Sequence, residues 1–163
     1  MGTYRFEVDV GLGPVDALFL WADLDRVTGW MGVGGVSDVV VGRGMDPLVL
    51  PGRRFPLVIA PESGYTLRFR FRPVRVQVMW LDDRSKTAYR TRLAGSLRRG
   101  ELLATFEQHG SGSHLTLDIQ TEGLLPGVVG RLLATGSYPG TYRGQLKAFA
   151  RLAERERLSR LIL

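Results

Sequence analysis

The chain has 163 residues, which suits one domain, and a domain of this size buries about 68–70% of the surface that its unfolded chain exposes. It contains no cysteine, which excludes disulfides, zinc–thiolate centres and thiol catalysis. The net charge of +6 and the sequence pI of about 10.3 would favour polyanionic partners only if the positive side chains lay together on one face. Burial of apolar side chains must therefore stabilise the fold.

The first thirty residues predict a strand and two short helical segments. Charged and apolar side chains alternate over residues 4–10, which is the pattern of a strand with one buried face. Gly11, Gly13 and Pro14 end this strand, and a short helix is expected over residues 15–21. A second short turn is expected over residues 23–30, which end in a tryptophan.

The middle of the chain predicts further strands. Residues 36–41 form a compact apolar strand, a long irregular connection rich in glycine and proline follows, and residues 53–60 are expected to be extended. Residues 65–71 alternate strongly between apolar and polar side chains. At Arg72-Pro73 the alternation changes phase, so that Val74 and Trp80 share the next apolar face, which predicts a turn or a bulge there.

The last part of the chain predicts a strand meander and a terminal helix. Strands over residues 87–94, 102–108 and 113–121 are separated by short turns, and such short links join antiparallel neighbours. Residues 142–157 have the apolar stripe of an amphipathic helix. Residues 128–133 also have a helical pattern, but Pro139 lies in between, and an interior proline costs a helix about 3 kcal/mol or more. The long helix is therefore predicted to be kinked or split near Pro139.

The order of these elements resembles the SRPBCC superfamily, the START-related helix-grip proteins that include polyketide cyclases, plant pollen allergens and lipid-transfer domains. Residues 4–10 resemble the first strand of the family, residues 21–30 resemble the Asp-Leu-x-Arg-x-x-x-Trp end of its short helices, and residues 110–117 and 145–150 are similar to its last hairpin and its C-terminal helix. The resemblance covers nearly the whole chain. It implies one α+β helix-grip domain over residues 1–163, in which a curved antiparallel sheet, two short helices and a long, kinked C-terminal helix enclose an apolar cavity.

Two histidines are the first candidates for chemistry. His109 and His114 flank a Gly-Ser-Gly turn, with Glu107 close by, but a metal or acid–base site would need inward-facing side chains and a third ligand. Because a glycine-rich hairpin tip usually lies at the surface, no metal site is expected. The glycines at 32–35 lack the third glycine of a dinucleotide fingerprint and precede a strand, and no phosphate-binding loop or nucleophile elbow occurs, so no cofactor is expected.

Four arginines, Arg68, Arg70, Arg90 and Arg92, occupy the polar phases of two predicted strands and would form a positive stripe on the outer face of the sheet. Nucleic-acid binding by such a stripe needs aromatic side chains between the arginines, whereas the aromatic residues of these strands take the opposite, buried phase. A solvated face is therefore the favoured interpretation, and no nucleic-acid partner is expected.

Aromatic and aliphatic side chains on the inward phases are the candidate ligand contacts. In a filled core they would only pack, whereas in a helix-grip cavity the same side chains would orient a ligand, in a void on the order of 300 Å³ or more. By strand phase, Tyr65, Tyr89, Thr91 and Asp38 are the polar candidates. The residues predicted to contact the ligand are Trp30, Trp80, Tyr89, Thr91, Phe106, Tyr138, Tyr142, Leu146 and Phe149.

The leading hypothesis is a cytosolic protein that binds an apolar or aromatic small molecule of the lipid, polyketide or isoprenoid type. No signal peptide or membrane span is expected, because no apolar run approaches the ~20 residues that a span needs. One alternative is a polyketide cyclase, dehydratase or aromatase, which predicts a buried Tyr, Asp or Arg pair within hydrogen-bond reach across the cavity. Another is a basic module for anionic membrane or nucleic acid, which predicts clustered, exposed arginines. The sequence leaves the oligomeric state and the identity of the ligand open.

Overall fold

A computed structural model describes residues 2–32, 34–40, 56–58, 64–68, 73–82, 87–95, 99–121 and 141–162. Its helical segments are α1 (Pro14–Ala22), the short 3-10 helix η1 (Val27–Gly29) and α3 (Tyr142–Ile162). Its strands are β1 (Gly2–Val10), β2 (Gly35–Val40), β3 (Pro56–Val58), β4 (Gly64–Arg68), β5 (Pro73–Asp82), β6 (Thr87–Ala94), β7 (Arg99–His109) and β8 (Gly112–Thr121).

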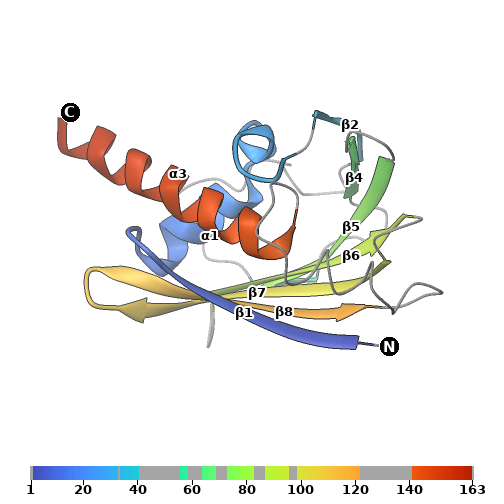
Figure 1. Cartoon of the computed structure of the whole chain (residues 1–163), viewed down its shortest axis with the longest axis horizontal. Coiled ribbons are helices and arrows are strands. Elements are labelled where there is room, and N and C mark those ends of the chain that lie inside the picture. Colours follow the sequence, from blue (N-terminus) through green and yellow to red (C-terminus); the bar gives the residue numbers. More distant parts are fainter. Residues whose placement is uncertain are drawn as a thin grey trace.

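The strands form one antiparallel sheet in the order β1-β8-β7-β6-β5-β4-β2, and β3 pairs with β5 beside this path. The sheet curves, and α3 crosses its concave side with α1 next to it (Figure 1). Helix α1 contacts β6, β7 and β8, whereas α3 contacts β1 and α1. The predicted α+β helix-grip architecture is therefore confirmed.

Alternation of side chains assigns the two faces of the sheet. In the pair of β1 and β8, Phe6 lies opposite Leu117 and both are buried, whereas Arg5 lies opposite Asp118 on the outer face. The Arg5 guanidinium Nε donates to the Asp118 carboxylate at 2.7 Å. The charged phase that the sequence showed in residues 4–10 is thus the outer, solvated face.

The predicted meander is present from β4 to β8. At its last hairpin, His109 pairs with Gly112, so that Gly110 and Ser111 form a two-residue turn. Gly110 has a φ of 58°, a conformation that glycine adopts without the steric penalty of a side chain. This turn places both histidines at one end of the sheet.

The turn or bulge predicted at Arg72-Pro73 falls where β4 ends and β5 begins. Strands β4 and β5 pair antiparallel, with Arg68 opposite Pro73, and residues 69–72 lie outside the described residues. A separate register shift, of β5 against β6, lies between Val78 and Trp80. The alternation that linked Val74 to Trp80 in the sequence is therefore interrupted in β5 itself.

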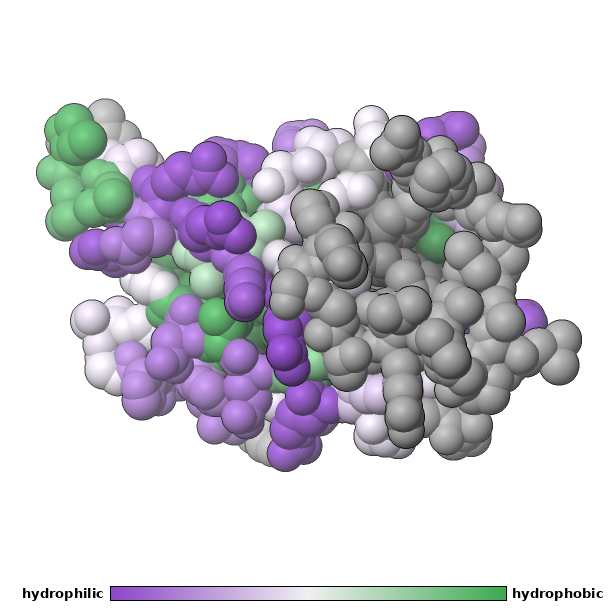
Figure 2. Space-filling view, viewed as in Figure 1, coloured by the Kyte–Doolittle hydropathy of each residue, from purple (hydrophilic) through white to green (hydrophobic). Residues whose placement is uncertain are grey.

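Helix α3 continues to Ile162, beyond the predicted end at residue 157. Its last turns carry Leu158, Leu161 and Ile162, which are 46%, 71% and 86% exposed. Figure 2 shows this apolar end of the helix projecting beside polar side chains. The helix predicted over residues 128–133 and the break at Pro139 lie outside the described residues. No described helix is both long enough and apolar enough to cross a membrane.

Candidate functional site

A pocket lies between the inner face of the sheet and the helices. Strands β4 to β7 supply one wall, and α1, α3 and the segment after η1 supply the other. Its lining residues are Trp21, Met31, Tyr65, Leu67, Val76, Tyr89, Thr91, Leu93, Leu102, Tyr142 and Gln145. Most of these side chains are apolar, and the few polar groups converge from different elements, which is the usual composition of a small-molecule site.

Two tyrosines form the polar centre of this pocket. Tyr65 on β4 and Tyr89 on β6 are 6% and 5% exposed, and their hydroxyls are hydrogen-bonded to each other. Burial raises the pKa of Tyr65 to about 12. Burial, followed by the proximity of Tyr65, holds the pKa of Tyr89 well above its ordinary value. Both hydroxyls therefore stay protonated, and neutral, throughout the physiological pH range.

A side-chain amide links the two helical segments beside the pocket. Gln145 lies in the first turn of α3, and its Nε2 donates to the backbone carbonyl of Met31 at 3.1 Å. Both residues line the pocket, and Gln145 is buried. This hydrogen bond holds the start of α3 against the segment between η1 and β2.

The pocket has a volume of about 30 Å³. A cavity needs roughly 10–15 Å³ for one water molecule by this kind of measure, so the space suits about two. The sequence pattern predicted a void on the order of 300 Å³. The described interior is smaller than that expectation because several of the inward aromatic side chains pack against one another.

These packed side chains form an aromatic cluster of Trp21, Trp30, Phe106 and Phe149. The ring centroids of Trp21 and Trp30 are 4.4 Å apart, and those of Trp21 and Phe149 are 5.0 Å apart. Trp30 and Phe149 lie 5.3 Å apart with their planes at 69°, an edge-to-face arrangement. Offset and edge-to-face pairs contribute about 0.5–1.5 kcal/mol beyond the burial of their area. Much of the inward aromatic surface is therefore core packing.

One polar atom of this cluster lacks a partner. The indole nitrogen Nε1 of Trp30 is buried and has no hydrogen-bond acceptor among the described residues. An unpaired buried donor costs about 1–3 kcal/mol. This atom is therefore a second place, besides the tyrosine hydroxyls, where the interior has unused hydrogen-bonding capacity.

The predicted ligand contacts divide into three groups. Tyr89, Thr91 and Tyr142 line the pocket. Trp30, Phe106, Leu146 and Phe149 are buried in the hydrophobic core and do not line it. The Trp80 side chain and Tyr138 lie outside the described residues, although β5 pairs the Trp80 backbone with Arg90 beyond the register shift.

Other lining residues were absent from that prediction. Tyr65 was named for its polar atom but not as a ligand contact, and its alternation with Leu67 already placed it inward. No feature of the sequence marked Gln145 or Met31 as a pocket residue. The Gln145 amide becomes informative only when its acceptor, the Met31 carbonyl, is known. Asp38, the remaining polar candidate, is exposed, and its backbone carbonyl accepts a hydrogen bond from Arg75 at 2.7 Å.

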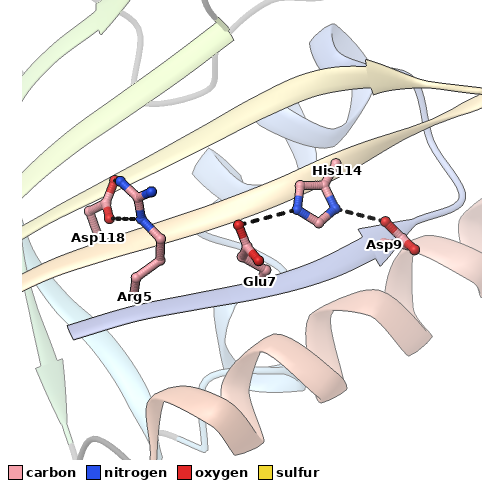
Figure 3. A network of polar contacts seen from close by, with 5 residues as sticks. All are labelled: Arg5, Glu7, Asp9, His114 and Asp118. Carbon is pink, nitrogen blue, oxygen red and sulfur yellow. Dashed lines mark hydrogen bonds and ion pairs between the residues drawn. The ribbon is translucent and has the colours of Figure 1, made fainter.

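The histidines lie on the outer face of the sheet, as Figure 3 shows for His114. His114 Nδ1 is 2.8 Å from the Asp9 carboxylate, and its Nε2 is 3.6 Å from that of Glu7. The hydrogen bond with Asp9 raises the pKa of His114 and lowers that of Asp9. Among the described residues, no group of three His, Cys, Asp or Glu side chains is placed to hold a metal ion.

The arginines of the predicted stripe also lie on this outer face, and acidic or hydroxyl groups accompany them. Arg92 and Arg90 approach the Glu101 carboxylate at 2.7 Å and 3.6 Å. Arg68 donates to the Ser37 hydroxyl at 3.0 Å, and Arg70 lies outside the described residues. The positive charge of this face is therefore partly neutralised.

Comparison with solved structures identifies proteins that share this fold. No family model matches the chain, and no curated protein matches it. Among solved structures, TTHA0849 from Thermus thermophilus aligns with 95% of this chain and 99% of its own, at a TM-score of 0.63 and 17% identity. Ara h 8.0201 aligns with 94% of this chain and 98% of its own, at a TM-score of 0.59 and 14% identity.

DynU16, a protein of the dynemicin biosynthetic locus, aligns with 93% of this chain at a TM-score of 0.60 and 16% identity. This chain spans about half of DynU16, namely 47% of its length. At such identities the likeness shows the fold. The shared fold agrees with the helix-grip architecture that the sequence resemblance implied.

Proposed function

We propose that the protein binds a small apolar or aromatic molecule of the lipid, polyketide or isoprenoid type in the pocket between the sheet and α3. The observation that carries this proposal is the lining of that pocket, where apolar side chains surround the Tyr65–Tyr89 hydroxyl pair. Tyr89, Thr91 and Tyr142 would contact the ligand directly, together with Tyr65 and Gln145. A cytosolic location is part of the same hypothesis.

Binding requires the pocket to widen. Its volume of about 30 Å³ is far below the roughly 300–1,000 Å³ of typical ligand pockets. The Gln145–Met31 hydrogen bond joins two segments of the helical wall, so it is the contact most directly strained when α3 and the segment after η1 separate. Ligand entry would then exchange this hydrogen bond for apolar contact with the ligand.

The fold of the neighbours supports a small-molecule role. One of them, DynU16, comes from the dynemicin biosynthetic locus. The proposal extends to Trp80 and Tyr138, which the sequence pattern predicted as ligand contacts. Trp30, Phe106, Leu146 and Phe149 would instead support the pocket from behind, since they are buried in the core beside it.

A cyclase-type enzyme is the second candidate, because one specific observation favours it. This alternative predicts a buried pair of polar side chains within hydrogen-bond reach, and Tyr65 and Tyr89 form such a pair. Two neutral hydroxyls in an apolar pocket can stabilise negative charge that develops on a carbonyl oxygen. Turnover of a polyketone by the wild-type protein, lost in Tyr65→Phe, would establish this candidate over simple binding.

A pair of matched variants tests the binding site. Thr91→Ile fills the pocket from β6, whereas Thr105→Ile makes the same change at a buried position of β7 that does not line the pocket. With the neutral fluorescent probe phenylnaphthylamine, we expect Thr91→Ile to weaken binding by about tenfold, because added bulk in a packed site costs about 1–3 kcal/mol. Thr105→Ile should bind as the wild type does.

Equal binding by all three proteins would place the probe outside this pocket and contradict the proposal. Native mass spectrometry of the protein purified from its own host gives an independent measurement. A co-purifying hydrophobic molecule that is retained by Thr105→Ile and lost from Thr91→Ile would identify the natural ligand.

A further inference from the structure

Helix α3 carries a line of positive charge on the side that faces away from its buried residues. The members of this α3 stripe are exposed and follow one another at intervals of four residues: Arg143, Lys147, Arg151 and Arg155. Residues four apart lie on one face of a helix, so the four charges form a single line. The guanidinium carbon of Arg143 also lies 5.7 Å from the centre of the Phe6 ring, a contact that keeps its charge.

Carboxylates of the chain do not neutralise the α3 stripe. Within the described residues, no ion pair joins any of its four members to an Asp or Glu side chain. Glu154 of the same helix is instead bound by Arg157, whose Nε donates at 3.0 Å. Glu156 pairs with Arg26 at 2.7 Å. The stripe thus differs from the outer face of the sheet, where arginines lie beside acidic side chains, and its charge is available to an anionic partner.

An apolar tip follows the α3 stripe at the C-terminal end of the helix. It consists of exposed aliphatic side chains: Val15, Leu158, Leu161 and Ile162. Asp16 pairs with Arg160 at 3.1 Å, which holds the first turn of α1, and with it Val15, beside the last turn of α3. Among the described residues, Val39 on β2 is the one other large apolar side chain that is exposed. Figure 2 shows the end of α3 projecting from the body of the molecule next to hydrophilic side chains.

The size and composition of this surface favour a lipid partner over a protein partner. A stable protein interface takes about 20–30 residues from each side, whereas the tip has four aliphatic side chains. A nucleic acid would use the charges of the stripe and leave the tip in water. A bilayer surface needs no complementary shape, and it accepts aliphatic side chains at the boundary between its headgroups and acyl chains. Anionic headgroups attract lysine and arginine within about one Debye length, ~8 Å.

We propose that the protein docks on an anionic lipid bilayer through α3, with the α3 stripe against the headgroups and the apolar tip inserted beneath them. Both features lie on the same helix, so they reach the bilayer together. This docking surface goes beyond the proposed function, because none of the residues of the stripe or the tip lines the pocket.

Co-sedimentation with vesicles tests the role of charge. Vesicles of phosphatidylcholine and phosphatidylglycerol in equal parts should bind the protein, and vesicles of phosphatidylcholine alone should not. Arg151→Gln/Arg155→Gln should weaken binding by about 20–30-fold, because each cation at an anionic surface contributes about fivefold. The matched control, Arg5→Gln/Arg92→Gln, removes the same charge from arginines paired on the outer face of the sheet and should bind as the wild type does. Added NaCl should weaken binding of the wild type.

A second pair of variants tests insertion of the tip. Leu161→Ser should weaken binding to the anionic vesicles by about fivefold, whereas Val39→Ser, a change at an exposed apolar residue of β2, should have no effect. The chain contains no cysteine, so Leu161→Cys and Val39→Cys each provide one thiol for the fluorophore NBD. Its emission should shift to the blue on addition of anionic vesicles at position 161 and stay constant at position 39.

Three results would overturn the proposal. The first is equal binding to both kinds of vesicle, or to neither. The second is a dimer in sedimentation velocity that Leu161→Ser dissociates, without vesicle binding, which would assign the tip to a second copy of the chain. The third is binding of polyglutamate that depends on Arg151 and Arg155, without an NBD shift on vesicles, which would assign the stripe to an acidic protein. Phenylnaphthylamine should bind all these variants equally in solution, so the proposed function is tested separately.

Discussion

The concave interior has two ends of opposite character, and strand β7 contributes to both. Phe106 of β7 lies in the aromatic cluster, where rings pack against rings at centroid distances of 4.4–6.3 Å. Leu102 of the same strand lines the pocket, where Tyr65 and Tyr89 border a small void. Phenylalanine can fill space completely, whereas a hydroxyl must keep room for a partner. An inward aromatic phase therefore does not define a binding site, but an inward hydroxyl pair is a sharper indicator.

The largest expected effect comes from removing a ring of the aromatic cluster. Phe149 is fully buried and contacts Trp21, Trp30 and Phe106. Phe149→Ala should lower the free energy of unfolding by about 3–5 kcal/mol, because the cavity left behind cannot collapse in a packed cluster. Urea denaturation measures this loss. Leu161→Ala, at a position 71% exposed, is the control and should change little.

A loss below about 1 kcal/mol in Phe149→Ala would mean that the cluster is loosely packed. In that case the contrast between the two ends of the interior would disappear. The cluster would then have to be treated as part of the ligand site.

The second effect concerns the backbone at the pocket end of β7. Gly100 has a φ of 141°, and a Cβ there would lie 1.9 Å from the backbone oxygen of Gln120. Gly100→Ala should destabilise the protein by about 1–3 kcal/mol from backbone strain, with the steric clash in addition. Thermal unfolding measures the effect. Gly29→Ala, where a Cβ meets nothing within 4 Å, should be nearly neutral, and equal effects of both changes would contradict the register of β7 with β8.

The third effect is a pH dependence of the free energy of unfolding, which the pocket end contributes and the aromatic cluster does not. The folded pKa of Tyr65, about 12, lies above the ordinary value of 10.0. The folded state therefore holds the proton more tightly, so the stability that this group contributes is complete below pH 10 and is lost as the pH rises toward 12. In urea titrations between pH 10 and 12, the free energy of unfolding of Tyr65→Phe should fall less steeply with pH than that of the wild type.

At neutral pH, Tyr65→Phe should cost about 1 kcal/mol, the net value of one buried hydrogen bond. Phe149→Leu is the matched comparison from the aromatic cluster, because it removes no titrating group. Its alkaline slope should equal that of the wild type. Identical slopes in Tyr65→Phe and the wild type would refute the buried protonated pair.

The smallest effect belongs to the outer face, behind the aromatic cluster. Hydrogen bonding to Asp9 raises the pKa of His114 above 6.5, so its contribution is complete below that pH and fades as the pH rises through the folded pKa. The lowered pKa of Asp9 acts in the opposite direction, and its contribution is lost as the pH falls through the acid range. His114→Gln should therefore be slightly destabilising near pH 5–6 and neutral near pH 8, where unfolding in urea is compared.

The control for this pair is Asp9→Asn, which should reduce the pH dependence that His114 contributes. Glu7, 3.6 Å from the other ring nitrogen, keeps part of the interaction in that variant. A dependence unchanged in both variants would assign the titration to other groups.

Much of the fold could be predicted from local patterns. The alternation in residues 87–94 and 113–121 predicted strands that match β6 and β8 closely, and the apolar stripe from Tyr142 predicted the start of α3. Periodicity works here because each strand has one buried face and one solvated face. The end of α3 was predicted too early because Leu158, Leu161 and Ile162 continue the helix without a core to cover them.

For the candidate site, the sequence predicted only which side chains face inward. Tyr89 and Thr91 are inward because of the alternation along β6, and Tyr142 is inward because of the apolar stripe of α3. These local patterns are enough to direct the three side chains to the concave side. Which inward side chains fill space and which border a void depends on volumes contributed by several elements at once. No local pattern predicts the combined volume of these side chains, because the packing depends on residues that are far apart in the chain.

The pairings between segments come from the assembled fold. Tyr65 meets Tyr89 because β4, β5 and β6 are neighbours with a fixed register. Gln145 meets Met31 because the first turn of α3 lies beside the segment between η1 and β2. The register shift between Val78 and Trp80 likewise has no signature in the alternation of β5. The sequence specified which face each side chain takes, since that is a property of consecutive residues. Contacts between segments required the curved sheet and its helix, because only their assembly brings distant polar atoms within hydrogen-bonding distance.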